Sequence, residues 1–201
     1  VGDVMGPASL DAAFFRLAAE WGKLDFLVHA IAYTDKAELA ADFRFRDTTR
    51  ANFAQTMDIS CFSFIDTARR AAAMMPDGGT ILTLTFEGSM RVMPCYNVMG
   101  VAKAALEASV RYLAADLGPQ GIRVNAVSPG PMKTLAGSAI GSARATYRQT
   151  EAAAPLRSNA TLEAVGGTAV YLASDAGAFT TGEIIRVDGG VHVMGIAQTE
   201  G

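Results

Sequence analysis

The sequence is poor in residues that bind metals or form disulfides, since its 201 residues include two cysteines and two histidines. Neither Cys61 and Cys95 nor His29 and His192 show the spacing of a metal-ligand or redox motif. We therefore expect no metal. The cysteines are interpreted as reduced thiols of a cytoplasmic protein, and the histidines as structural or solvated side chains.

Blocks of like charge are also absent. The net charge is −3 and no basic run occurs, which argues against a nucleic acid as partner. No apolar run approaches the roughly 20 residues that a membrane-spanning helix needs. Val1 to Val4 lack the basic-then-apolar pattern of a signal peptide. With 50% hydrophobic residues, the chain is long and apolar enough to form one globular core. We expect this protein to bind neither nucleic acid nor membranes.

What the sequence does contain is an alternation of two hydrophobic periods. Residues 7–21 place apolar side chains on one helical face, with Pro7 in the first turn and Gly22 at the end. Residues 24–31 are apolar on both faces, which is typical of a strand buried in a parallel sheet. The alternation continues with helices expected at 49–75, 96–117 and 161–172, and strands at 80–85, 122–127 and 183–187.

Strands that alternate with helices imply right-handed βαβ crossovers. The expected fold is therefore α/β: a Rossmann-like, doubly wound parallel sheet in three αβα layers, forming a single domain over residues 1–201. No glycine-rich phosphate loop occurs, and strand 24–31 would be an aggregation hazard at a sheet edge. We expect about two βαβ units, of roughly 30 residues each, to be missing before Val1. The alternative is a small, complete, four-stranded protein.

Tyr96 and Lys103 form the pattern with the clearest chemical meaning. They are seven residues apart, nearly two turns if 96–117 is helical, so both side chains would leave the same face. A phenol has an ordinary pKa of about 10, and a nearby ammonium favours its ionised form. The pair could therefore exchange a proton beside a reacting carbonyl. The alternative is a surface lysine beside a half-buried tyrosine.

The position of this pair favours the catalytic interpretation. It follows a strand and a Pro-Cys turn, which places it at the carboxyl end of a sheet strand, where open α/β sheets bind ligands. The next strand leaves through Pro-Gly-Pro (129–131), whose glycine lets the backbone approach a ligand closely. Thr134 adds a hydroxyl nearby.

Four segments in this order resemble the short-chain dehydrogenase/reductase family: Tyr-x6-Lys, Arg-Val-Asn-Ala (123–126), Pro-Gly (129–130) and Val-Asp-Gly-Gly (187–190). Within that family the chain is most similar to the NADH-dependent enoyl-acyl-carrier-protein reductases of bacteria. The similarity rests on YNVMGVAK (96–103), ALEASVRYLA (105–114), GPMKTLA (130–136) and TGEI (181–184). The segment HAIA (29–32) also resembles that group's HSIG more than the NNAG of other members.

This resemblance implies an enzyme of fatty-acid synthesis that reduces the trans-2 double bond of an enoyl thioester on acyl-carrier protein. It implies NADH as cofactor, with NADPH possible, a homotetramer, and a flexible substrate loop at about 134–150. Tyr96 would bond the thioester carbonyl and Lys103 the nicotinamide ribose. The other implied contacts are, for the cofactor, Asp3, Val4, Ala30, Ile31, Ala32, Gly130, Met132 and Thr134, and, for the substrate, Thr34, Met99 and Leu135 beside Tyr96.

Two positions depart from the family pattern. Members of this group often carry a second tyrosine ten residues before the first, where this chain has Phe86, which cannot donate a hydrogen bond. We therefore expect Tyr96 to act alone. Most other family members have a serine thirteen residues before the tyrosine, where this chain has Thr83. We interpret Thr83 as an ordinary strand residue. Two alternatives stay open: a 3-ketoacyl or other carbonyl reductase of the same fold, and a non-catalytic member that acts in assembly or binding.

Overall fold

A parallel sheet forms the centre of the computed structural model, which describes residues 3–134, 137 and 140–195. In this part of the chain the strands are β1 (Phe26–His29), β2 (Gly79–Leu84), β3 (Ile122–Pro129) and β4 (Ile184–Val187), in the spatial order β1-β2-β3-β4. All neighbouring strands are parallel. The expected α/β class is confirmed.

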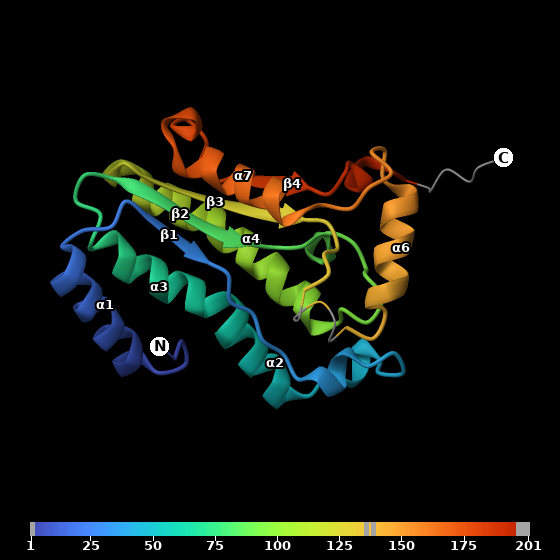
Figure 1. Cartoon of the computed structure of the whole chain (residues 1–201). Coiled ribbons are helices and arrows are strands. Elements are labelled where there is room, and N and C mark those ends of the chain that lie inside the picture. The colour runs from blue at the N-terminus through green and yellow to red at the C-terminus, as the bar shows by residue number, and fades with distance from the viewer. Residues whose placement is uncertain (1–2, 135–136, 138–139, 196–201) are drawn as a thin grey trace.

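Helices cover both faces of this sheet. In Figure 1, α3 and α4 lie below the strands and α7 lies above them, which gives the predicted αβα layers. The α-helices are α1 (Pro7–Trp21), α2 (Arg50–Met57), α3 (Ser63–Ala72), α4 (Val98–Leu117), α6 (Ala143–Ala153) and α7 (Leu162–Ala173), with a π-helix at Asp58–Phe62. Short 3-10 helices occur at Lys36–Leu39, Phe45–Asp47, Glu87–Ser89, Gly118–Gln120, Asp175–Gly177 and Val191–Val193.

Local sequence signals set several helix ends. Helix α1 has Pro7 at its first position and ends at Gly22, whose φ of 72° suits glycine. The Thr49 hydroxyl accepts a hydrogen bond from the Asn52 backbone N–H and caps α2. Thr161 caps α7 in the same way, as predicted.

The main core lies between the sheet and helices α3 and α4. Phe64, Ile81, Leu106 and Val124 are fully buried there, and each such side chain contributes about 1.5–3 kcal/mol of burial free energy. This packing presses α4 against β3. The first turn of α4 is thereby held beside the carboxyl ends of the strands.

Two helix predictions were wrong in detail. The stretch 49–75 is not one regular helix, because a π-helical turn at 58–62 separates α2 from α3. The helix expected at 96–117 begins at Val98, so Tyr96 lies in the turn before it. Cys95 and Asn97 have φ values of 62° and 46°, which are incompatible with a right-handed helix.

Strand β1 forms one edge of the described sheet. Its apolar side chains Phe26 and Val28 are 57% and 46% exposed. The expectation that further strands precede Val1 stays a prediction. Among the described residues, no helix combines the length and apolar character that crossing a membrane requires.

Candidate active site

The sheet brings most of the predicted cofactor residues to one edge. Ala30 to Ala32 follow β1, and Gly130, Met132 and Thr134 follow β3. Because parallel strands end at the same side of a sheet, these segments share the edge at which open α/β sheets bind ligands. Residues 30–32 are exposed there, while Gly130 is buried and Met132 is half-buried.

Some predicted contacts are placed elsewhere or are already engaged. Asp3 and Val4 precede α1, and the Asp3 carboxylate accepts a hydrogen bond from the Met5 backbone N–H at 3.0 Å. The buried Thr34 hydroxyl bonds with Asn52 and Thr56 side chains. Leu135 and part of the expected 134–150 loop lie outside the described residues, namely 135–136 and 138–139. The binding roles given to these positions stay predictions.

Lys103 is a buried cation at the end of β2. Its side chain points from α4 to the sheet, where Nζ donates a hydrogen bond to the Leu84 carbonyl oxygen at 2.7 Å, and the residue is 7% exposed. Burial lowers the pKa of Lys103 to about 8, against the opposite effect of the Glu107 carboxylate. The bond to Leu84 uses one of three ammonium hydrogens, which leaves two for a ligand.

Glu107 lies one helical turn beyond Lys103 on α4 and was missed by the sequence analysis. It is buried, and its Oε1 accepts a hydrogen bond from the Thr85 hydroxyl at 2.6 Å. Lys103 and Glu107 thus bond to consecutive residues, Leu84 and Thr85, and fasten α4 to the end of β2. The spacing of four residues was a usable signal, because it places an acid next to the lysine on a helix.

Tyr96 packs in a tight pocket near the carboxyl end of β2. It is 8% exposed and packs with Leu39 and Met99, while the substrate-binding role expected of Met99 stays a prediction. The Phe86 ring meets the Tyr96 ring edge-on, with centroids 5.0 Å apart. A Cβ atom added at Gly88 would lie 2.4 Å from Tyr96 Cδ1, so the ring needs glycine there.

The expected effect of Lys103 on the tyrosine was wrong. Burial, with a smaller contribution from the Glu107 carboxylate, raises the pKa of Tyr96 above its ordinary value. A buried phenolate would lose its hydration, and the Lys103 ammonium is turned toward the Leu84 carbonyl. The phenol therefore keeps its proton and can act as a hydrogen-bond donor.

The backbone on both sides of Tyr96 is strained. Cys95 and Asn97 adopt positive φ values, which are uncommon for residues other than glycine and cost on the order of 1–3 kcal/mol each. The Asn97 side chain also donates a hydrogen bond from Nδ2 to the Glu38 carbonyl oxygen at 2.7 Å. Hydrophobic periodicity carries no signal for such a turn.

His29 has a structural role beneath this site. It is 2% exposed, its Nε2 lies 2.8 Å from the Ser63 hydroxyl, and the Thr83 hydroxyl donates to its carbonyl oxygen at 3.1 Å. Burial, with a smaller effect of the Lys103 charge, lowers the pKa of His29 to about 4. The interpretations of His29 as structural and of Thr83 as a strand residue are confirmed.

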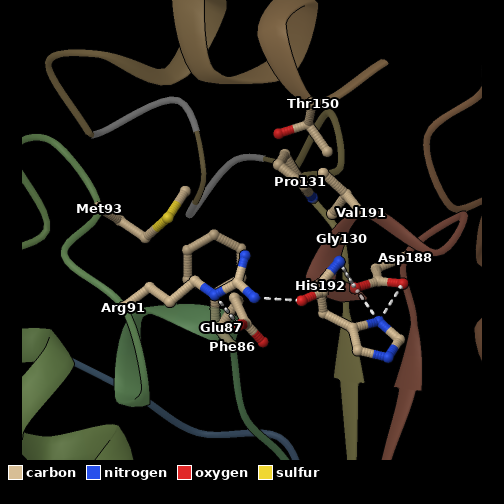
Figure 2. A pocket seen from close by; sticks show the side chains of 10 residues that line it. All are labelled: Phe86, Glu87, Arg91, Met93, Gly130, Pro131, Thr150, Asp188, Val191 and His192. Atoms are coloured by element: carbon tan, nitrogen blue, oxygen red, sulfur yellow. Dashed lines mark hydrogen bonds and ion pairs between the residues drawn. The ribbon is translucent and has the colours of Figure 1, made fainter. Parts of the chain in front are cut away.

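In the described part of the chain, one hollow lies at this edge of the sheet and another at the opposite edge. Figure 2 shows the first, a cavity of ≈ 80 Å³ beside Phe86, where Arg91 reaches the His192 carbonyl oxygen and His192 bonds Asp188. It is far below the roughly 300–1,000 Å³ of a ligand pocket. The second, of ≈ 520 Å³, lies at the amino ends of β2 and β3, away from Tyr96. Neither hollow defines the candidate site, which is assigned to the carboxyl edge because Tyr96, Lys103 and most of the predicted cofactor residues lie there.

Metal ligands do not gather in this site. Across residues 3–134, 137 and 140–195, no group of three or more His, Cys, Asp or Glu side chains could hold a metal ion. The polar groups brought together are the Tyr96 phenol, the Lys103 ammonium and the Glu107 carboxylate. Such a set can donate hydrogen bonds and protons to a ligand.

Comparison with known proteins gives consistent matches along the chain. Residues 1–192 match a family described as enoyl-(acyl carrier protein) reductase. The chain is 57% identical to enoyl-[acyl-carrier-protein] reductase [NADH] 1 of Rhizobium meliloti, over 96% of this chain and 71% of the relative. It is 51% identical to the corresponding NADH enzyme of Rickettsia felis, over 96% and 74%.

Solved structures agree with these matches. A reductase of the same name from Anaplasma phagocytophilum, in complex with NAD, superposes with a TM-score of 0.94 at 52% identity, over 98% of this chain and 75% of that one. The Bacillus cereus enzyme with NADP+ and indole naphthyridinone gives 0.93 at 47% identity, over 96% and 75%.

The buried His29 predicts a specific loss of stability in acid. Its pKa is about 4 when folded and about 6.5 when unfolded, so below pH 6.5 the unfolded chain binds the extra proton. The stability contributed by neutral His29 is present above pH 6.5 and is lost as the pH falls to about 4, by about 3 kcal/mol. Urea unfolding of wild type and His29→Gln at several pH values measures this. A free-energy difference between the two that stays constant from pH 7 to 4 would contradict it.

Proposed function

Because the chain belongs to the enoyl-(acyl carrier protein) reductase family, we propose that it reduces the trans-2 double bond of enoyl thioesters carried on acyl-carrier protein, using NADH, in fatty-acid synthesis. The observation that carries the proposal is the arrangement at the carboxyl end of β2, where the buried Lys103 ammonium bonds the Leu84 carbonyl oxygen at 2.7 Å and the buried Tyr96 ring packs on Phe86. Intact catalytic groups argue against a non-catalytic family member.

The residues present fit the nicotinamide half of such a cofactor. Lys103 has ammonium hydrogens free for ribose hydroxyls after its bond to Leu84, and the small residues 30–32 leave the adjoining edge open. The cofactor contact expected at Gly130 stays a prediction, because a Cβ atom there would lie 3.1 Å from Asp188 Cα, so packing alone already explains the glycine. The relatives named above support NADH, and the neighbour with NADP+ keeps NADPH as the alternative.

Tyr96 supplies the polar group at the reacting end. When bound, the reduced nicotinamide provides the hydride for the β-carbon of the enoyl thioester, and negative charge develops on the thioester oxygen. A buried phenol that keeps its proton can donate a hydrogen bond at that point. Phe86 packs on the phenol ring and has no hydrogen to donate, so Tyr96 is proposed to act alone.

One contact favours enoyl over carbonyl reduction. The Thr83 hydroxyl, at the position of the serine in most other family members, donates to the His29 carbonyl oxygen at 3.1 Å and is fully buried. A hydroxyl engaged in this way is not available to a substrate carbonyl. This supports the enoyl assignment over the 3-ketoacyl alternative.

The direct test is turnover by a full-length gene product that includes any residues preceding Val1. We expect NADH oxidation with crotonyl and longer enoyl thioesters and none with a 3-ketoacyl thioester. Tyr96→Phe should lower kcat by about 10²–10³-fold, as loss of an oxyanion donor does, with unchanged NADH affinity. Tyr112→Phe on the exposed side of α4 is the control. The reverse substrate preference would contradict the enoyl assignment.

Cofactor binding should depend on the charge of Lys103. NADH affinity is expected to fall as the pH rises through about 8, because Lys103 loses its proton there. Glu107→Gln removes the carboxylate that raises this pKa, so the fall should move to lower pH. Fluorescence titration of NADH binding measures this, with Asp116→Asn on the same helix as control. An unshifted curve for Glu107→Gln would count against the electrostatic role of this carboxylate.

The extent of the domain and its location belong to the same proposal. We propose a single domain over 1–201. The substrate loop expected at about 134–150 is only partly a loop, because residues 143–150 belong to α6, and its residues 135–136 and 138–139 lie outside the described part of the chain. The free thiols of Cys61 and Cys95 support a cytoplasmic location. The acyl-carrier-protein-bound substrate follows from the family.

We also propose a homotetramer with two kinds of interface. Phe53, Phe62 and Ile65 are exposed on the α2–α3 side of the sheet, and Leu162 and Val170 are exposed on α7 at the other side. A tetramer with dihedral symmetry needs two such self-complementary patches.

The two patches can be tested separately. In light scattering of the full-length protein, Phe62→Arg and Val170→Arg should each give dimers, and the double variant monomers, because each charge would be buried at one interface. Ala19→Arg on exposed α1 is the control. A wild type that is monomeric, or variants that remain tetrameric, would contradict the proposal.

A further inference from the structure

The turn that carries Tyr96 has a built-in tether. Asn97 follows Tyr96 directly and adopts φ 46° and ψ −126°, a backbone region that suits glycine far better than asparagine. At the same time the Asn97 amide Nδ2 donates a hydrogen bond to the Glu38 carbonyl oxygen, 2.7 Å away. This strained residue is therefore fixed by a contact with a segment 59 positions away.

The acceptor of this bond is itself held in place. The buried Glu38 carboxylate accepts hydrogen bonds from the Thr49 backbone N–H at 3.2 Å and the Thr49 hydroxyl at 2.7 Å, at the start of α2. The next residue, Leu39, packs against Tyr96 and Met99. The Glu38 carbonyl is thus a rigid anchor, since its side chain and its neighbour are both fixed.

We infer that Asn97 is a positioning residue that aims the Tyr96 hydroxyl through its hydrogen bond to the Glu38 carbonyl oxygen. The inference rests on the proposed function, in which Tyr96 donates to the thioester oxygen. It extends that function to a residue that touches neither substrate nor cofactor.

The surroundings of Tyr96 explain why the turn needs this tether. Gly88 and Phe86 confine the ring, and Gly100 lies so close to the Gly88 carbonyl oxygen that a Cβ atom there would be 2.7 Å from it. Because the ring is confined in this way, a shift in the backbone of residues 95–97 would displace it. A hydrogen-bond donor acts on a developing charge only when it is accurately placed, so a tether on this turn bears directly on turnover.

Asparagine suits this position for two reasons that can be separated by mutation. It tolerates positive φ better than most residues, and it supplies an amide donor. Glycine at position 97 would also tolerate the positive φ, but it has no side-chain amide to donate a hydrogen bond. Aspartate keeps the shape and the tolerance, but its carboxylate cannot donate to the Glu38 carbonyl oxygen. Asn97→Gly and Asn97→Asp therefore both remove the tether without imposing a backbone clash.

The test is steady-state kinetics of the full-length protein with NADH and a crotonyl thioester. Both variants should lower kcat by about tenfold to a hundredfold, the range expected for a misplaced catalytic group. NADH affinity should stay within about twofold of wild type, because Lys103 is anchored separately. An unchanged kcat in Asn97→Gly would overturn the inference.

A double-mutant cycle with Tyr96→Phe distinguishes a loss of kcat caused by a misplaced Tyr96 hydroxyl from a loss caused by general disruption of the structure. If Asn97 acts through the phenol hydroxyl, Asn97→Gly should cause little further loss of kcat in the Tyr96→Phe background. Asn125→Ala is the control, because it removes a similar amide bond, from Nδ2 to the Thr180 carbonyl oxygen at 2.7 Å, outside the residues proposed to bind substrate or cofactor. Its effect should be equal in both backgrounds.

The possible outcomes are distinct. An equal fold-loss from Asn97→Gly in the two backgrounds overturns the positioning role while leaving the proposed function intact. A wild-type protein that oxidises no NADH with any enoyl thioester overturns the proposed function, and this inference with it. A loss confined to the Tyr96 background supports both.

Discussion

The buried ammonium of Lys103 is the constraint on which the rest of the site depends. Moving a charge out of water costs several kcal/mol even after the protein relaxes, and here the Leu84 carbonyl and the Glu107 carboxylate offset that cost. Both partners are available only because α4 is pressed against the end of β2. The apolar packing of Leu106 and Phe64 therefore determines the position of the Lys103 ammonium.

The Glu107 carboxylate acts in one direction on the two groups proposed to be catalytic. Glu107 raises the pKa of Lys103 and that of Tyr96, so it favours the protonated form of each. A protonated lysine can hold hydroxyl groups, and a protonated phenol can donate to an oxygen that becomes negative. A tyrosine ionised by the lysine would have no hydrogen to donate to that oxygen. The electrostatics thus fit a hydrogen-bond donor rather than a phenolate base.

Periodicity was sufficient for the scaffold and insufficient for the turn. Helix α1 has the predicted bounds, the four strands lie within a few residues of those expected, and the carboxyl edge follows from the parallel order. The conformations of Cys95 and Asn97 were not predictable, because a positive φ leaves no trace in the pattern of apolar residues. The contact of Asn97 with Glu38 is also long-range. In contrast, the Lys103–Glu107 spacing was present in the sequence and could have been used.

The departure at Phe86 and the strain around Tyr96 are best understood together. In the proposed function, phenylalanine at position 86 leaves Tyr96 as the single phenol that can donate a hydrogen bond to the thioester oxygen, so no neighbouring phenol could compensate for its misplacement. Two residues with positive φ hold that phenol, at a cost on the order of 1–3 kcal/mol each. Glycine at position 97 would relieve part of this strain, yet it would also release the turn from the Glu38 carbonyl. The strain is therefore better explained by the accuracy that Tyr96 needs than by folding stability.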